Sequence, residues 1–264
     1  RLRTVTGVQT CALPIFFTAQ NTYSGATIVS NGTLQAGANF VLSTNTALTV
    51  ANGATFTNNF QQAVGSIAGP GSIILGSGAV LSNGFNGGNT TFSGVISGPG
   101  SVAKYGAGIL SLSASNTYSG FTTISAGTLA LTGSGAITNS PTITVNTDAQ
   151  FDVSGVNGGV YNLANSQTLK GRGTVVGNLN IANGSILSPG TSPGTITNSG
   201  TLIWSGGGHY LWEINDFSGN QGLDPGWDFV QVIGVLSNAA TSGNKFNIDI
   251  TSLDRKSTRL NSSH

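Results

Sequence analysis

The sequence has few charged residues, no methionine and a single cysteine, Cys11. Charged residues make up 6% of the chain and Glu213 is its one glutamate, so residues that favour helices are scarce. One cysteine cannot supply a disulfide framework or a thiolate metal site. No apolar run approaches the roughly 18 residues that a membrane-spanning helix needs. These shortages argue against a helical bundle, a disulfide scaffold and a membrane-spanning segment.

The two ends of the chain resemble one translated sequencing adapter read in opposite directions. We therefore interpret residues 1–15 and 254–264 as adapter artefact and leave them out of the fold prediction. Cys11 lies in the first stretch, and five of the nine Lys and Arg lie in the two stretches together. The remaining four basic and seven acidic residues give a net charge of −3. This net negative charge argues against nucleic acid as a partner.

Glycine is abundant, at 40 of 264 residues, and turns of Gly, Asn or Ser-Gly separate short runs of Thr, Ile, Val and Leu. The recurring apolar residues and low net charge argue against disorder, and the lack of a strict three-residue glycine period excludes collagen. Such runs predict strands of three to five residues. The predicted strands are 27–29, 33–35, 47–50, 72–75, 101–104, 109–112, 122–124, 128–131, 142–145, 150–153, 174–176, 179–181 and 185–187.

One phrase occurs twice, as Asn21-Thr-Tyr-Ser-Gly25 and Asn116-Thr-Tyr-Ser-Gly120, and each copy leads into a Thr/Ile strand and a Gly-Thr-Leu strand. A second echo is Gly-Pro-Gly-Ser, at 69–72 and 98–101. Strands this short bury too little apolar surface to offset their ordering entropy, whereas stacked copies form one continuous core. The echoes therefore predict an all-β solenoid over residues 16–200, with turns of variable length.

The pattern changes near residue 200. Runs at 201–204, 209–214, 228–235 and 245–250 are longer and richer in aromatic residues. Terminal repeats of a solenoid are expected to be atypical. We therefore predict that residues 201–253 form a more irregular, partly antiparallel segment that covers the open edge of the solenoid.

These residues resemble a known family, the autotransporter-associated β-strand repeat, also called the passenger-associated transport repeat. The resemblance is most specific over residues 100–129, and residues 19–36 are similar to the second half of another unit. Residues 187–196, 210–216 and 227–230 resemble the segments that follow such repeats. The resemblance implies a right-handed parallel β-helix, secreted or displayed at the outer membrane of a Gram-negative-type bacterium. It also implies export machinery in the parent protein.

Two polar groups were considered as metal sites. His209 and Glu213 share one face of a strand, but most metal sites need three or four ligands, so a surface histidine is the simpler interpretation. The loop from Asp216 to Asp224 alternates oxygen donors and loosely imitates a calcium loop, although its glycine falls one place late and no glutamate closes it. A polar hairpin loop is the simpler interpretation. Its oxygen donors are Asp216, Ser218, Asn220 and Asp224.

A polysaccharide lyase or hydrolase is the enzymatic alternative, because such sites cluster carboxylates with cations. Between residues 17 and 200 the chain offers Asp148, Asp152, Lys104, Lys170 and Arg172. The two carboxylates could neighbour Lys170 and Arg172 on adjoining turns. A solvated surface cluster is the simpler account.

Tyr23 and Tyr118 occupy matching positions in the two copies of the repeat. They could stack on sugars, or pack as repeated corner residues, which we favour. The sequence thus predicts a structural stalk or passenger segment of an exported surface protein, adhesive rather than enzymatic. Its partners would be glycans or other cell surfaces. No catalytic, cofactor-binding or metal-binding residue is assigned.

Overall fold

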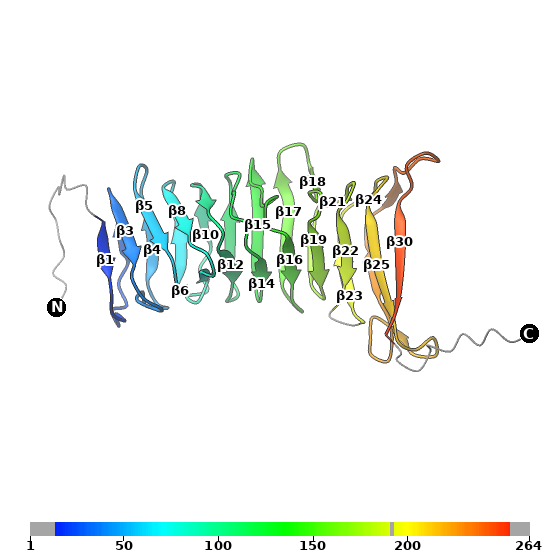
Figure 1. Cartoon of the computed structure of the whole chain (residues 1–264), viewed down its shortest axis with the longest axis horizontal. Helices are drawn as coiled ribbons and strands as arrows, with labels where there is room; N and C mark the ends of the chain where they lie inside the picture. The colour runs from blue at the N-terminus through cyan, green and yellow to red at the C-terminus, as the bar shows by residue number, and fades with distance from the viewer. Residues whose placement is uncertain (1–13, 191–192, 254–264) are drawn as a thin grey trace, which may run out of the picture.

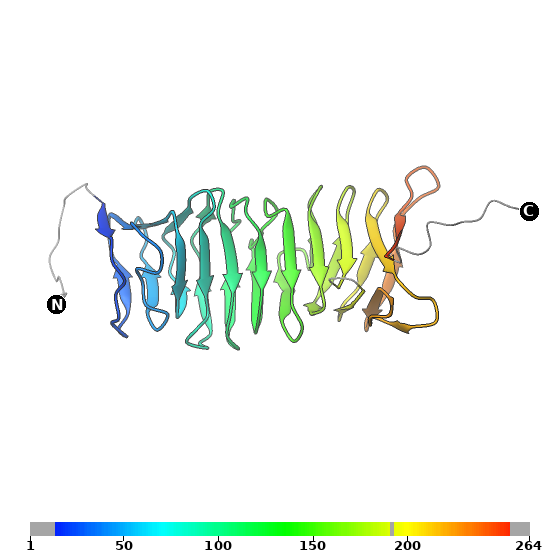
Figure 2. The ribbon, with the colours of Figure 1, turned by 60° about the horizontal axis from the view of Figure 1, so that its bottom comes forward.

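The computed structural model describes residues 14–190 and 193–253. Its regular elements are strands, stacked in parallel into an elongated β-solenoid of about nine turns, with the N-terminal and C-terminal strands at opposite ends (Figures 1 and 2). The predicted fold class is confirmed. No helix in the described ranges has the length and hydropathy to cross a bilayer.

Each turn of the solenoid passes through three faces. The first face holds two sheets, linked through residues 114–117 and 136–137: β1 (Ile15–Phe17), β3 (Thr33–Ala36), β5 (Thr55–Asn58), β8 (Ser72–Leu75) and β11 (Ile96–Ser97), then β18 (Val160–Asn162), β21 (Asn178–Ile181), β24 (Leu202–Trp204) and β29 (Leu236–Asn238).

The second face is an 11-stranded sheet. Its strands are β6 (Gln61–Val64), β9 (Val80–Asn83), β12 (Ser101–Lys104), β14 (Thr122–Ile124), β16 (Thr142–Val145), β19 (Thr168–Gly171), β22 (Ile186–Pro189), β25 (His209–Ile214), β26 (Asn220–Gln221), β27 (Gly226–Trp227) and β30 (Asn247–Ser252).

The third face joins a three-stranded and a seven-stranded sheet through the bridge between Gly69 and Phe92. Its strands are β2 (Thr27–Val29), β4 (Ala47–Val50), β7 (Ser66–Ala68), β10 (Thr90–Phe92), β13 (Ile109–Leu112), β15 (Thr128–Gly133), β17 (Gln150–Val156), β20 (Thr174–Val176), β23 (Thr195–Asn198) and β28 (Phe229–Val232).

The core runs along the solenoid axis as columns of inward side chains. On the third face Leu110 pairs with Leu129, and Leu129 with Phe151, and all three are at most 1% exposed. Alternate residues of these strands point outward and are mostly Thr, Ser and other polar residues. Each buried side chain of this size stabilises the fold by about 1.5–3 kcal/mol. Stacking therefore supplies the burial that no single short strand could provide.

The Gly-Pro-Gly-Ser echo forms the same turn at two different corners. Gly69 follows β7 and leads from the third face to the first, whereas Gly98 follows β11 and leads from the first face to the second. Both have positive φ, 104° and 94°. A Cβ at either position would lie 2.2 Å from a carbonyl oxygen of the preceding turn, that of Val50 or Leu75. The local sequence thus specifies a corner and not a particular face.

The two copies of the Asn-Thr-Tyr-Ser-Gly phrase likewise lie at different corners of the solenoid. The first copy leads into β2 on the third face, and the second leads into β14 on the second face. The repeat in sequence and the turn of the solenoid therefore have different periods. This difference explains why the echoes are irregularly spaced along the chain.

The C-terminal segment extends the solenoid. β28, β29 and β30 pair in parallel with β23, β24 and β25, so each face gains a further strand. The predicted antiparallel character is confirmed in the pairing of β25 with β27, which belongs to an excursion between β25 and β28. The predicted cover is not formed in the described ranges. β30 ends the second face, with Ile248 and Ile250 52% and 67% exposed.

The proposed domain boundaries relate to the fold as follows. The adapter interpretation of residues 1–13 and 254–264 lies outside the described residues. Residue 15, which was grouped with the adapter, begins β1 and pairs with Leu34. The boundary at residue 200 falls between β23 and β24, where all three faces continue.

Candidate functional site

The tyrosine of the second repeat copy is part of a buried chain of hydroxyl groups. Tyr118 is 0% exposed and its Oη lies 2.7 Å from Thr122 Oγ1. Thr122 in turn donates to the hydroxyl of Ser140 on the next turn of the solenoid, at 2.9 Å. Because the hydroxyl hydrogen of Thr122 is donated to Ser140, the phenol of Tyr118 is the donor to Thr122, and burial raises its pKa. The chain joins two adjacent turns from the inside.

The first copy repeats this arrangement. Tyr23 Oη lies 2.6 Å from Thr27 Oγ1, which lies 2.8 Å from Thr46 Oγ1 on the next turn. Tyr23 is half-buried, because it lies near the N-terminal end of the solenoid. The interpretation as packed corner residues is confirmed for Tyr118, whose ring has no surface on which a sugar could stack. Both tyrosines hold neighbouring turns together.

Asn116, which opens the second copy, joins three successive turns. Its side chain is buried, and its Oδ1 accepts a hydrogen bond from the main-chain N–H of Ile96 on the preceding turn, at 2.9 Å. Its Nδ2 donates to the carbonyl oxygens of Ala114, at 2.8 Å, and of Ala136 on the following turn, at 3.2 Å. Both N–H groups and the oxygen of the amide are thus hydrogen-bonded.

Asn21 makes the matching bonds in the first copy. Its Nδ2 donates to the carbonyl oxygens of Ala19, at 3.0 Å, and Val41, at 2.8 Å. Two segments far apart in sequence therefore share one set of contacts, in which asparagine and tyrosine link consecutive turns. The asparagine and tyrosine of the repeat motif stabilise the stacking of consecutive turns of the solenoid.

In the described residues, neither carboxylate considered for catalysis forms an ion pair with a cation. Asp152 accepts hydrogen bonds from the N–H and hydroxyl of Ser154, at 2.9 and 2.6 Å. Asp148 lies in the turn between β16 and β17, while Arg172 at the next turn donates to the carbonyl oxygen of Pro193, at 2.7 Å. The one ion pair found in the described ranges involves neither carboxylate. Lys170 lies in β19 on the second face, whereas Asp152 lies in β17 on the third face.

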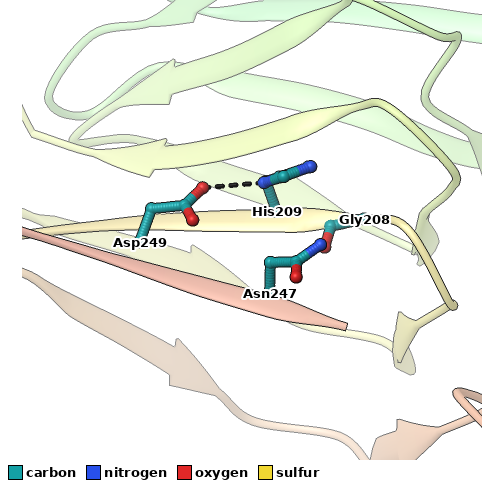
Figure 3. A network of polar contacts seen from close by, with 4 residues as sticks. All are labelled: Gly208, His209, Asn247 and Asp249. Atoms are coloured by element: carbon teal, nitrogen blue, oxygen red, sulfur yellow. Dashed lines mark hydrogen bonds and ion pairs between the residues drawn. The ribbon is translucent and has the colours of Figure 1, made fainter. Parts of the chain in front are cut away.

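His209 pairs with Asp249 and not with Glu213. His209 Nδ1 lies 2.7 Å from Asp249 Oδ2, and the two side chains are 35% and 50% exposed (Figure 3). The pair links β25 to β30, where Asn247 Nδ2 also donates to the carbonyl oxygen of Gly208, at 3.5 Å. These contacts fasten the last strand of the second face. In the described part of the chain, no group of three or more His, Cys, Asp or Glu is placed to hold a metal ion.

The loop that imitates a calcium site is bonded to itself. Asp216 Oδ1 accepts from the N–H and hydroxyl of Ser218, at 2.8 and 2.7 Å, and these bonds lower the pKa of Asp216. Asp224 accepts a hydrogen bond from Asn215 Nδ2, and Asn220 belongs to β26. Three of the four supposed donors, Asp216, Ser218 and Asp224, thus form local hydrogen bonds. The arrangement is that of a polar hairpin loop.

Lys104 is a buried cation beneath one corner of the solenoid. It is 1% exposed and ends β12, where its Nζ donates to the carbonyl oxygens of Tyr105, at 2.6 Å, Gly106, at 2.8 Å, and Ala126, at 3.3 Å. Burial lowers the pKa of Lys104 to about 8. The ammonium group holds together the main chain of two successive corner turns.

Asp228 is a buried carboxylate that joins three segments. Its Oδ1 accepts from the N–H of Gly194, at 2.8 Å, and its Oδ2 from the N–H of Glu213, at 2.9 Å. Its main-chain oxygen accepts from Trp212 Nε1, at 2.7 Å. Burial raises the pKa of Asp228 to about 6, and the backbone hydrogen bonds and Arg172 oppose this rise. Asp228 thereby anchors the C-terminal excursion to the solenoid.

The raised pKa of Asp228 predicts that stability falls as pH rises. Between about pH 4 and pH 6 the folded protein holds a proton that the unfolded chain has released, so ionisation favours unfolding. We expect the free energy of unfolding to fall by about 2–3 kcal/mol across this window, and Asp228→Asn to remove that fall. Urea unfolding at half-unit pH steps, followed by tryptophan fluorescence, measures it. Asp216→Asn is the control, since the pKa of that exposed group is shifted in the opposite direction. Equal pH slopes for wild type and Asp228→Asn would contradict this assignment.

Sequence reasoning missed the roles of Lys104 and Asp228. For Lys104 a signal existed, because alternation along β12 places residue 104 on the same face as the inward Val102. Asp228 lies just before β28, and its partners come from separate segments of the chain. No local pattern pointed to it.

Comparison with known proteins agrees with the repeat geometry. The profile of the passenger-associated-transport-repeat matches residues 15–36 and 102–131, which contain the two copies described above. The Adhesin BmaC autotransporter of Brucella suis biovar 1 (strain 1330) is 37% identical over 103 residues, or 39% of this chain and 2% of that protein. The chain thus spans a small fraction of that relative's length. No solved structure matches the chain significantly. The resemblance to the repeat family is confirmed.

Proposed function

We propose that this chain, an autotransporter-associated repeat protein, is a stalk or passenger segment of an exported bacterial surface protein with an adhesive role. The observation that carries the proposal is the shared hydrogen-bond set of the two repeat copies. In both copies, the asparagine and tyrosine side chains form hydrogen bonds that join consecutive turns. Side chains that join each turn to the next are what a long, continuous scaffold requires.

The physical properties of the solenoid suit exposure outside a cell. The strands from β12 to β17 are each paired on both sides, so this part of the chain presents no free strand edge to other chains. Local opening of one turn is opposed by its neighbours, which limits access for proteases. The repeat family and the adhesin relative support a cell-surface or secreted location in a Gram-negative bacterium, with export machinery in the parent protein.

We favour adhesion over catalysis because three of the charged side chains serve structural contacts. Lys104 and Asp228 bond to the main chain, and Arg172 donates to a carbonyl oxygen. The outward positions are mostly Thr, Ser and Asn, which suit weak, repeated contact with glycans or other cell surfaces. The adhesive role also rests on the name of the relative.

Attachment of coated beads tests the proposal. Beads that carry the purified chain are expected to attach to epithelial cells at least fivefold more than albumin-coated beads, since many weak contacts act together. In parallel, the chain is incubated with pectin, alginate and xylan, and new reducing ends are measured. Attachment at the albumin level would contradict the adhesive role. Turnover that is lost in Asp148→Asn or Asp152→Asn would establish the enzymatic alternative instead.

A further inference from the structure

One long edge of the solenoid, between the second and third faces, carries two stacked aromatic side chains. Phe85 and Tyr105 lie in the turns from β9 to β10 and from β12 to β13, on consecutive turns of the solenoid. Their rings are 5.0 Å apart at an angle of 18°, and the residues are 44% and 37% exposed. Stacking covers the inner face of each ring, so the apolar surface that the pair exposes consists of ring edges and outer faces.

A shallow groove follows on the same edge, and we call it the edge groove. It begins at Ala107, two residues after Tyr105, and continues on the next two turns of the solenoid. The Thr128 hydroxyl lies 3.5 Å from Gln150 Oε1, and both Gln150 and Asp148 are exposed. Hydroxyl, amide and carboxylate groups therefore lie on the same edge, on the two turns that follow Tyr105. The edge groove is lined by Ala107, Ala126, Gly127, Thr128, Asp148 and Gln150.

Lys104 fixes the aromatic pair relative to the edge groove. Its ammonium group binds the carbonyl oxygens of Tyr105 and Gly106 in one turn and of Ala126 in the next. The main chain that carries the ring of Tyr105 is thus tied to the floor of the edge groove. A binding surface held in place before the ligand arrives loses less entropy on binding.

We infer that this edge binds a neutral oligosaccharide, with one sugar ring on the Phe85–Tyr105 pair and the neighbouring hydroxyl groups in the edge groove. A sugar ring combines an apolar C–H face with hydroxyl groups around its rim, and this edge offers complements to both. The turns of the solenoid repeat at about 4.8 Å, so successive sugars of a chain can meet successive turns.

Charge and pairing argue against other ligands. Asp148 is the charged side chain of the edge groove, and the next cation along this edge, Arg172, is engaged by Pro193. The carboxylate of Asp148 would repel an anionic glycan or a nucleic acid in the edge groove, and the exposed Arg172 lies one turn beyond the groove. The strands beside the edge groove, from β12 to β17, are paired on both sides, so an extended peptide could not add to them as a further strand.

The inference rests on the adhesive role proposed above, and glycan-array binding tests it separately. The purified chain is applied to immobilised hexasaccharides of glucose, xylose, mannose and N-acetylglucosamine, and the best ligand is then titrated calorimetrically. We expect Tyr105→Ala and Phe85→Ala each to weaken binding about tenfold, and Asp148→Asn about threefold. Tyr105→Phe keeps the ring and should retain binding. Phe121→Ala is the matched control, since that 59% exposed ring lies on another edge and should change nothing.

Circular dichroism melting of each variant verifies that the solenoid is folded. Retention of no neutral hexasaccharide at millimolar concentration would overturn the inference. So would equal binding by the Phe85→Ala/Tyr105→Ala double variant and the wild type. If beads that carry the double variant still attach to cells at the wild-type level, the edge is not the adhesive site while the adhesive role stands.

Discussion

Replacing Asn116 by aspartate is expected to lower the free energy of unfolding by about 4 kcal/mol. The amide Nδ2 donates to two carbonyl oxygens, at 2.8 and 3.2 Å, in a site that is 1% exposed. Aspartate would set a carboxylate oxygen against both carbonyls, where it is repelled and cannot be hydrated. The effect should be large because this one side chain joins three turns. Urea unfolding at pH 7, followed by circular dichroism, measures it.

Asn21→Asp is the matched control. Asn21 makes the same two donations but is only half-buried, so water can hydrate the new carboxylate. We expect a loss of about 1–2 kcal/mol. Equal losses in the two variants, or no loss in Asn116→Asp, would show that the asparagine does not lock the turns. The loss of unfolding free energy in Asn116→Ala should lie between those of Asn21→Asp and Asn116→Asp, since alanine removes the hydrogen bonds without adding a charge.

Replacing Gly98 by alanine is expected to cost about 3–5 kcal/mol. Its φ of 94° is strained for any residue with a side chain, and a Cβ would lie 2.2 Å from the carbonyl oxygen of Leu75. That oxygen belongs to the main chain of the preceding turn and cannot move without breaking the stack. Thermal unfolding followed by circular dichroism gives the change.

Gly78→Ala separates the effect of backbone strain from the effect of the Cβ clash. Gly78 has φ of 72°, but an added Cβ would meet nothing within 4 Å. Only the backbone strain then applies, and we expect about 1–2 kcal/mol. If Gly98→Ala lowers the free energy of unfolding no more than Gly78→Ala does, the close contact between Gly98 and the carbonyl oxygen of Leu75 is contradicted.

The sequence predicts the strands in which apolar and hydroxyl residues alternate. Ser101–Lys104 and Thr142–Val145 were predicted with the bounds that are observed, because their inward and outward residues differ plainly in character. β5, β6 and β9 were missed, since inward positions there hold Asn58, Gln62 and Asn83. Those amides are buried and bond to neighbouring turns, so polar residues occupy core positions.

Contacts between turns were harder to predict than strands. The number of residues per turn varies, so the partner of a given side chain cannot be counted off along the chain. His209 meets Asp249 because the excursion between β25 and β28 lengthens one turn, and the nearer Glu213 is not its partner. The aromatic pair depends likewise on which turns are adjacent, since Phe85 and Tyr105 lie in separate turns. The sequence therefore predicted the solenoid architecture but not the aromatic pair on the edge between the second and third faces.

Surface display tests the central claim most directly, namely that the chain is an externally exposed passenger segment. The whole chain is fused between a signal sequence and a membrane translocator in a Gram-negative host, with an epitope in the exposed turn at Asn157–Gly159. That turn tolerates insertion, because Gly158 and Gly159 have open space around them. We expect antibody to label intact cells, and external protease to cut at the epitope while the rest of the solenoid survives. Labelling only after permeabilisation, or degradation of the whole segment, would contradict the account.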